Sequence, residues 1–190
     1  MKRNRVNIVT LGCSKNTVDS QKLMRQLAAG GYSVTAGSAD PADIVIINTC
    51  GFINDAKEES VDTIIRYAEA IRREGHGRLF VMGCLVERYR NELQHELPEV
   101  DGWFGVNRPQ EIISRLGLAY REELTGERVI TGPAHYAYLK VSEGCERTCA
   151  FCAIPDIRGR YISAPLEKLV EEARLLASQG VKELILIAQD

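Results

Sequence analysis

The chain has 190 residues, of which 45% are hydrophobic and 26% are charged, and its formal net charge at pH 7 is -2. This composition is ordinary for a soluble globular protein of one or two domains, and the net charge gives no electrostatic reason to expect nucleic acid as the main partner. No segment approaches the roughly 20 apolar residues of a membrane-spanning helix, so we expect a cytoplasmic protein with no membrane partner and with reduced thiols.

Residues 1–116 alternate short apolar runs with amphipathic stretches, which predicts an N-terminal domain of alternating strands and helices. The apolar runs cover 6–11, 43–48 and 79–83. Near-continuous apolar strands are typical of a parallel sheet that is covered on both faces. Helices are predicted over 17–29, 55–74 and 86–96, where apolar residues recur three or four positions apart. The predicted fold class is therefore α/β, with a doubly wound parallel sheet.

Three cysteines, Cys13, Cys50 and Cys84, each follow one of these apolar runs. The carboxyl ends of parallel strands meet at one edge of the sheet, where open α/β sheets bind their ligands. Each cysteine could instead be a small core residue, since free cysteine is among the most buried residue types. Their shared position favours a metal or cluster site, because each stands beside a glycine that lets the backbone approach a bulky group.

A linker is predicted over 117–135, where the periodicity fades and turn signals appear, with one short strand expected at 128–131. Residues 136–190 then predict the start of a second domain, with a strand over 136–141, a helix over 166–179 and a strand over 184–188. This is one βα unit and one further strand, the beginning of an α/β barrel. A complete barrel needs roughly 200 or more residues, so we expect this domain to be incomplete.

The loop after the strand over 136–141 carries three more cysteines, Cys145, Cys149 and Cys152. A ferredoxin-type cluster takes four thiolates, so a 4Fe-4S cluster held by three would keep one iron open to chemistry. Zinc is the weaker interpretation, because a zinc site requires four ligands and the nearest histidine, His135, lies upstream. Six cysteines could also form disulfides, but disulfides are typical of secreted chains.

The spacing of these three cysteines, with an aromatic residue before the last, resembles the radical S-adenosylmethionine (SAM) signature. In that superfamily three thiolates hold a 4Fe-4S cluster, and the open iron chelates SAM, which is then split to give a deoxyadenosyl radical. The resemblance implies that Cys145, Cys149 and Cys152 are cluster ligands. It also implies that SAM is a cofactor and that Phe151 packs near its adenine.

Four separated segments together resemble the methylthiotransferase family of radical SAM enzymes, and the resemblance covers nearly the whole chain. They are residues 11–16 with 18–20, residues 47–53, residues 83–85 with 88–89, and residues 143–155 with 158–159. The resemblance implies that Cys13, Cys50 and Cys84 hold a second 4Fe-4S cluster, whose open iron carries the sulfur to be transferred. It also implies that SAM acts both as methyl donor and as radical source.

Within this family, details favour the RimO type, which adds a methylthio group to the β-carbon of an aspartate in small-subunit ribosomal protein twelve. Relatives of the MiaB type, which modify adenosine in transfer RNA, usually carry Gln-Met-Asn at residues 14–16 and an Ala-Gln pair at 85–86, unlike this chain. A radical step suits an aspartate β-carbon, whose hydrogen is far too weakly acidic for side-chain bases. The implied partner is a ribosomal protein, and we expect neither direct nucleic-acid binding nor catalytic residues beyond the cluster ligands.

Two features depart from the family pattern. Ala164 stands where the family usually has arginine, which puts a nearby polar contact in doubt. Residues 136–190 supply only the first part of a barrel, so we expect the chain by itself to hold one or two clusters and to be inactive. The alternatives are a transfer RNA methylthiotransferase and a non-catalytic iron-sulfur protein, and the sequence does not indicate an electron donor.

Overall fold

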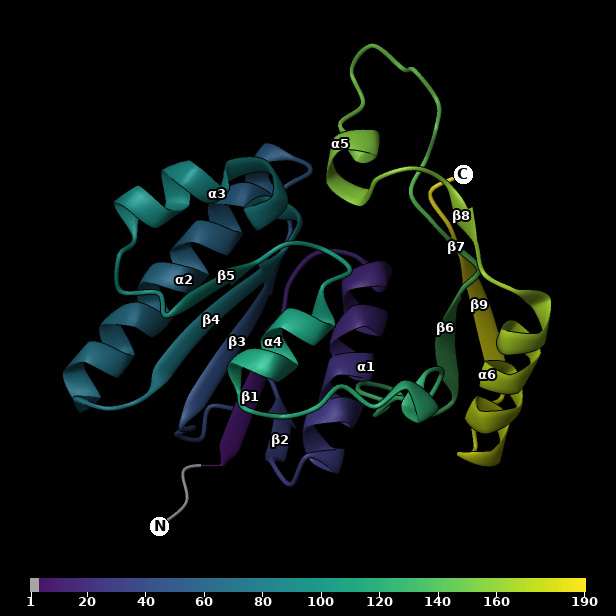
Figure 1. The fold of residues 1–190 in the computed structure, drawn as a ribbon, viewed down its shortest axis with the longest axis horizontal. Coiled ribbons are helices and arrows are strands. Elements are labelled where there is room, and N and C mark those ends of the chain that lie inside the picture. The colour runs from purple at the N-terminus through teal and green to yellow at the C-terminus, as the bar shows by residue number, and fades with distance from the viewer. Residues whose placement is uncertain (1–3) are drawn as a thin grey trace.

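The fold of residues 4–190 is given by a computed structural model, in which a parallel α/β sheet precedes a smaller unit (Figure 1). The larger sheet contains β1 (Arg5–Thr10), β2 (Ser33–Ala36), β3 (Ile44–Thr49), β4 (Arg78–Gly83) and β5 (Gly102–Phe104). Every pairing in it is parallel, and the strand order is β2-β1-β3-β4-β5. The three predicted strands are β1, β3 and β4, which form the centre of this sheet.

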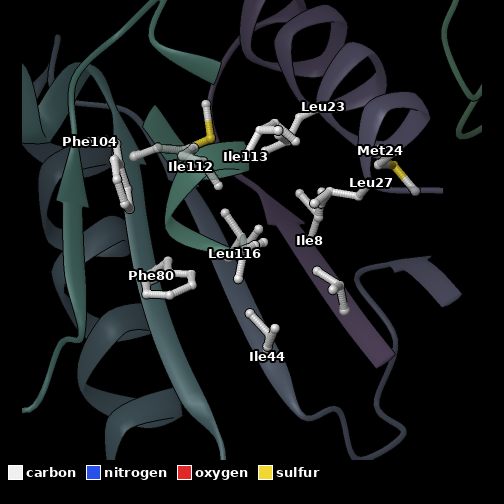
Figure 2. Packing of buried hydrophobic residues seen from close by; sticks show 13 residues of the cluster. Ile8, Leu23, Met24, Leu27, Ile44, Phe80, Phe104, Ile112, Ile113 and Leu116 are labelled. Atoms are coloured by element: carbon white, nitrogen blue, oxygen red, sulfur yellow. The ribbon is translucent and has the colours of Figure 1, made fainter. Parts of the chain in front are cut away.

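Helices cover both faces of the sheet, which confirms the predicted doubly wound arrangement. The helices α1 (Ser14–Ala29) and α4 (Pro109–Arg115) pack on one face, and α2 (Asn54–Glu74) and α3 (Cys84–Glu96) pack on the other. Because successive strand residues point to opposite faces, Ile46 belongs to the first core and Ile47 to the second. Figure 2 shows the first core, where Leu23 and Ile113 face the strands.

Two of the predicted helices begin two or three residues earlier than expected, and this places two cysteines at helix starts. The helix α1 begins at Ser14, so Cys13 is its N-cap residue, and α3 begins at Cys84 itself. The first turn of α1 is polar, so the apolar periodicity does not mark it, whereas α3 starts directly after β4 with no intervening turn. It also missed β2, whose residues are mostly exposed, and the short elements β5 and α4.

The smaller unit consists of β6 (Tyr136–Lys140), α6 (Leu166–Ser178) and β9 (Glu183–Ile187), with β6 and β9 paired in parallel. This confirms the predicted strand, helix and strand to within one residue at each end. A loop between β6 and α6 contains a two-residue antiparallel pair, β7 (Ser142–Glu143) and β8 (Ile162–Ser163), and the short helix α5 (Ile154–Arg158). Apart from residues 1–3, which lie outside the described part, no helix has the length and apolar character to cross a membrane.

The segment between the two units contains a short 3-10 turn, η1 (Glu122–Leu124). The prediction of a strand at 128–131 is wrong, because these residues form no strand. The backbone N–H of Val129 donates to the carbonyl oxygen of Gln21 in α1, over 3.2 Å. The Gln21 side chain in turn donates to the Thr131 hydroxyl, over 3.1 Å. The segment therefore lies along α1, and these hydrogen bonds join it to a helix instead of a neighbouring strand.

Candidate functional site

A cavity of about 470 Å³ at the carboxyl edge of the large sheet is lined by all three N-terminal cysteines. Cys13 follows β1, Cys50 follows β3, and Cys84 follows β4. In a sheet of order 2-1-3-4-5, the strand order reverses between β1 and β3, which is the switch point where such sheets bind ligands. The structure thus brings together the three residues that the sequence placed at strand ends.

Three glycines allow the cysteine-bearing turns to pack against one another. A Cβ added at Gly12 would lie 2.5 Å from the Cβ of Cys50, and one added at Gly83 would lie 2.5 Å from the Thr49 carbonyl oxygen. A Cβ at Gly51 would lie 2.8 Å or less from backbone atoms of α3. Gly12 and Gly83 also have positive φ angles, 84° and 105°, which other residues rarely adopt. These glycines serve the approach of one protein segment to another, in addition to leaving room beside the thiols.

Buried polar side chains fix the turns in place. The Nδ2 atom of Asn16, which is 1% exposed, donates to the carbonyl oxygens of Leu11 (2.8 Å) and Thr49 (3.0 Å). It therefore ties α1 to the ends of β1 and β3. The Oδ1 atom of Asn16 lies 4.0 Å from the Sγ atom of Cys84. Asn16 belongs to the motif at 11–16, but the sequence alone assigned it no contact.

Cys50 is held on its backbone by a second buried polar residue. The Ser60 hydroxyl accepts from the Cys50 N–H (3.1 Å) and donates to the Cys50 carbonyl oxygen (3.0 Å). The next carbonyl, that of Gly51, accepts from Nη1 of Arg88 over 2.8 Å. The turn at Cys50 and Gly51, which follows β3, is therefore anchored by side chains of α2 and α3.

Arg158, at the end of α5, lines the same cavity and is 2% exposed at its side chain. Its Nη2 atom donates to Oδ1 of Asn16 (2.6 Å), and its Nη1 atom donates to Oδ2 of Asp19 (2.9 Å) and lies 3.5 Å from Oε1 of Glu143. The Nζ atom of Lys140 contacts the same two carboxylates, at 2.5 and 2.7 Å. These four charged residues, Asp19, Lys140, Glu143 and Arg158, form a largely buried ion-pair network that joins α1 to the smaller unit.

The network and the cavity shift several pKa values. Burial alone would raise the pKa of Asp19, but Lys140 and Arg158 reverse this effect and hold it below its ordinary value. Burial likewise opposes the charge of Arg158, but Asp19, Cys84 and Glu143 together outweigh burial and raise the pKa of Arg158. Burial raises the pKa of the Cys84 thiol, and the positive charge of Arg158 only partly offsets this.

The donor set of the cavity fits a polynuclear metal group. A thiol is deprotonated when it coordinates a metal, and the three thiols here line one cavity whose other walls include the apolar Phe52, Ile53 and Ile154. Among residues 4–190 no three His, Cys, Asp or Glu side chains converge closely enough to hold a single metal ion. In a 4Fe-4S cluster each thiolate binds a different iron, so the ligands do not need to converge on one point.

The second cysteine set lies in the loop between β7 and α5, which extends away from the sheets (Figure 1). Cys145 is buried, Cys152 is half-buried and Cys149 is exposed, and all six cysteines of the chain are free thiols. The loop is closed at its base, where the Cys145 N–H donates to the Gly159 carbonyl oxygen over 3.1 Å. The N–H of Cys152 donates to the Cys149 carbonyl oxygen over 3.1 Å, so these two cysteines lie on one turn.

Three further residues singled out in the sequence, Phe151, Ala164 and His135, do not line the N-terminal cysteine cavity. Phe151 is 95% exposed, so its predicted packing near an adenine stays a prediction. The Ala164 N–H donates to the Val141 carbonyl oxygen over 2.9 Å, and its methyl group cannot make the polar contact that an arginine would offer. The His135 ring stacks edge-on against Tyr136, with ring centroids 5.1 Å apart.

Comparison with known sequences matches both parts of the chain. The Uncharacterized protein family UPF0004 matches residues 5–105, and the Radical SAM superfamily matches residues 139–190. The chain is 54% identical over 191 residues to the protein named ribosomal protein uS12 methylthiotransferase RimO of Phocaeicola vulgatus. It is 53% identical over 192 residues to the protein of the same name from Flavobacterium johnsoniae. Both matches cover 100% of this chain but only 44% of the relative.

Comparison with solved structures shows a shared fold. The structure of the radical S-adenosylmethionine methyltransferase TsrM from Kitasatospora setae, with cobalamin and a 4Fe-4S cluster bound, matches with a TM-score of 0.61 and 14% sequence identity. The match covers 100% of this chain and 48% of that one. At this identity the likeness concerns the arrangement of the elements.

Proposed function

The chain belongs to the family UPF0004, and from that premise we propose that it is part of a radical SAM methylthiotransferase that modifies ribosomal protein uS12. The convergence of Cys13, Cys50 and Cys84 on one cavity carries the proposal, because a radical SAM segment alone would not require a second set of three thiols. The relatives named RimO support the choice of reaction and substrate. The proposed target atom is the β-carbon of an aspartate in uS12.

The proposed cofactors are SAM and two 4Fe-4S clusters. Cys13, Cys50 and Cys84 would hold one cluster, and Cys145, Cys149 and Cys152 would hold the other, which binds SAM. When bound, these groups would supply the sulfur, the methyl group and the radical. We propose that the chain is organised as a cluster-binding domain at 1–116, a linker at 117–135 and the start of a radical SAM domain at 136–190.

The described side chains would shape the N-terminal site in three ways. Gly12, Gly51 and Gly83 set the spacing of the three thiols through the close packing of their turns. Residues of α5, among them Ile154, complete the cavity wall from the second unit and reduce its contact with water. Asn16 and Arg158 connect that wall to α1 through a 2.6 Å hydrogen bond, so the cavity is built by both units together.

The substrate can be tested in cells that carry or lack the full-length gene. Mass spectrometry of uS12 should find a mass increase of one methylthio group that depends on the gene and is lost in a Cys50→Ala variant. A Cys50→Ala variant removes one proposed ligand with little change in volume, and Ser60 would still hold the backbone. Unmodified uS12 together with gene-dependent methylthio-adenosine in transfer RNA would instead support the transfer RNA enzyme.

Binding of SAM separates the enzyme from a non-catalytic iron-sulfur protein. The chain spans 44% of the length of the relatives it matches, so we propose that it binds iron without producing deoxyadenosine from SAM. Release of deoxyadenosine by the purified 190-residue chain would contradict this expectation of inactivity. A full-length protein that binds iron but no SAM would contradict the proposed enzyme.

A further inference from the structure

Arg158 is the point where the second unit reaches the N-terminal cysteine cavity. It follows the Cys145–Cys152 loop in the sequence, yet it lines the cavity that contains Cys13, Cys50 and Cys84. Its side chain is 2% exposed, so its guanidinium group is surrounded by protein and has little contact with water. In such surroundings a charge acts over several ångströms with little screening.

The contacts of Arg158 fix the guanidinium on the side of Cys84. Asn16 accepts the Nη2 hydrogen bond at 2.6 Å with the same Oδ1 atom that lies 4.0 Å from the Cys84 sulfur. Asp19 accepts from Nη1 at 2.9 Å, so two acceptors orient the planar group. A guanidinium held on two sides has little freedom to turn away from the cavity.

The charges around Arg158 are balanced, but only one of them belongs to the cavity wall. Lys140 and Arg158 face the carboxylates of Asp19 and Glu143, which makes two positive and two negative groups. Of these four residues, Arg158 alone lines the cysteine cavity. Lys15 is a further cation on that wall, on the α1 side. The network therefore presents one of its two positive members, Arg158, to the thiols, while its two carboxylates do not line the cavity.

We propose that Arg158 is a positioning residue that raises the reduction potential of the group bound by Cys13, Cys50 and Cys84. The inference rests on the proposed function, because it requires a cluster at that site. Reduction adds negative charge to a cluster, and a nearby buried cation stabilises the reduced form more than the oxidised form. Arg158 also belongs to the segment that follows the second cysteine loop. The charge at the N-terminal site therefore depends on where the second unit places this segment.

The test uses the chain with Cys145, Cys149 and Cys152 all changed to alanine, so that iron bound by the chain reports on the N-terminal site. After anaerobic reconstitution, iron content and the midpoint potential from a spectroscopically monitored redox titration are measured. In this background, Arg158→Gln should retain iron and shift the potential to a more negative value. Lys140→Gln is the matched control, because it removes the same charge from the same network away from the cavity, and its shift should be clearly smaller. Arg158→Lys, which keeps the charge, should lie between the parent and Arg158→Gln.

Glu143→Gln supplies an independent test should Arg158→Gln fail to fold. It removes a carboxylate 3.5 Å from Arg158 and should move the potential in the opposite direction, to a less negative value. Equal shifts in Arg158→Gln and Lys140→Gln, or an unchanged potential in both Arg158→Gln and Glu143→Gln, would overturn the inference. Absence of iron in the parent background would instead contradict the proposed cluster site itself.

Discussion

The two cysteine sets are assembled in different ways. Cys145, Cys149 and Cys152 lie within one loop, so their spacing is a property of the local sequence. Cys13, Cys50 and Cys84 follow three different strands, and they meet only because the parallel sheet aligns the carboxyl ends of β1, β3 and β4. The first kind of site can form wherever its loop is intact, whereas the second requires the whole sheet and the packing of its turns. Substitutions that disturb the sheet or the junction between the units should therefore affect the N-terminal site more than the site in the loop.

The largest effect is expected for Gly83→Ala. Gly83 has a φ of 105°, and an added Cβ would meet the Thr49 carbonyl oxygen at 2.5 Å, so backbone strain and overpacking combine. We expect a loss of about 4 kcal/mol in the free energy of unfolding, measured by urea denaturation. Gly117→Ala is the control, because Gly117 also has a positive φ (75°) but no atom within 4 Å of an added Cβ. Similar losses in the two variants would refute the idea that close packing of the turns matters.

Asp19→Asn tests the junction between α1 and the smaller unit. It removes the carboxylate that faces both Lys140 and Arg158 and leaves two largely buried cations with one partner fewer. The expected loss in the free energy of unfolding at neutral pH is about 3 kcal/mol. Glu127→Gln is the matched control, since the Arg25–Glu127 pair is one-third exposed and should contribute less than about 1 kcal/mol. If the two variants lost equal stability, the buried network would have no special role at the junction.

The stability contributed by Asp19 should also depend on pH. The folded protein holds the pKa of Asp19 below its ordinary value, because Lys140 and Arg158 outweigh the effect of burial. A lowered folded pKa gives stability that is fully present above the unfolded pKa of about 3.9 and is lost as the pH falls through the folded pKa. The difference in unfolding free energy between the parent and Asp19→Asn should therefore shrink as the pH falls below about 4. A difference that stays constant from pH 7 to pH 3 would show that the carboxylate charge is not its source.

The sequence was sufficient to predict the centre of the sheet and the convergence of its three cysteines. Apolar runs mark β1, β3 and β4 because these strands are buried on both faces, and parallel strands place their carboxyl ends together. The edge strand β2 has no such run, since most of its residues are exposed. The strand β5 has only three residues, too few for a period to be recognised.

The polar part of the site could not be predicted from the sequence. Arg158 contacts Asn16 and Asp19, which lie far from it in the chain, and no periodicity or spacing indicates that α5 packs beside α1. The sequence marks Asn16 only as part of a motif and gives no sign of the role of Ser60, because a single polar residue within a helix has many uses. Such contacts depend on how the two units pack against each other, which only the tertiary structure contains.

The smallest effect is expected for Phe151→Ala in the second cysteine loop. Phe151 is 95% exposed, so its removal should change the free energy of unfolding by less than about 0.5 kcal/mol. Phe80→Ala is the contrasting control, because Phe80 is fully buried and stacks edge-on with Phe104, and its removal should cost about 4 kcal/mol. Thermal or urea unfolding of both variants measures this difference. A large loss for Phe151→Ala would mean that the loop is packed more tightly than its exposure indicates.

The central claim, that two separate sets of three cysteines each hold a cluster, is tested most directly by iron content. The chain is reconstituted anaerobically with iron and sulfide, and iron per chain is measured in the parent and in the Cys13→Ala/Cys50→Ala/Cys84→Ala variant. Two four-iron clusters predict about eight irons in the parent and about four in the variant. About four irons in both proteins would contradict the claim and would leave the N-terminal cysteines as residues that only line a cavity.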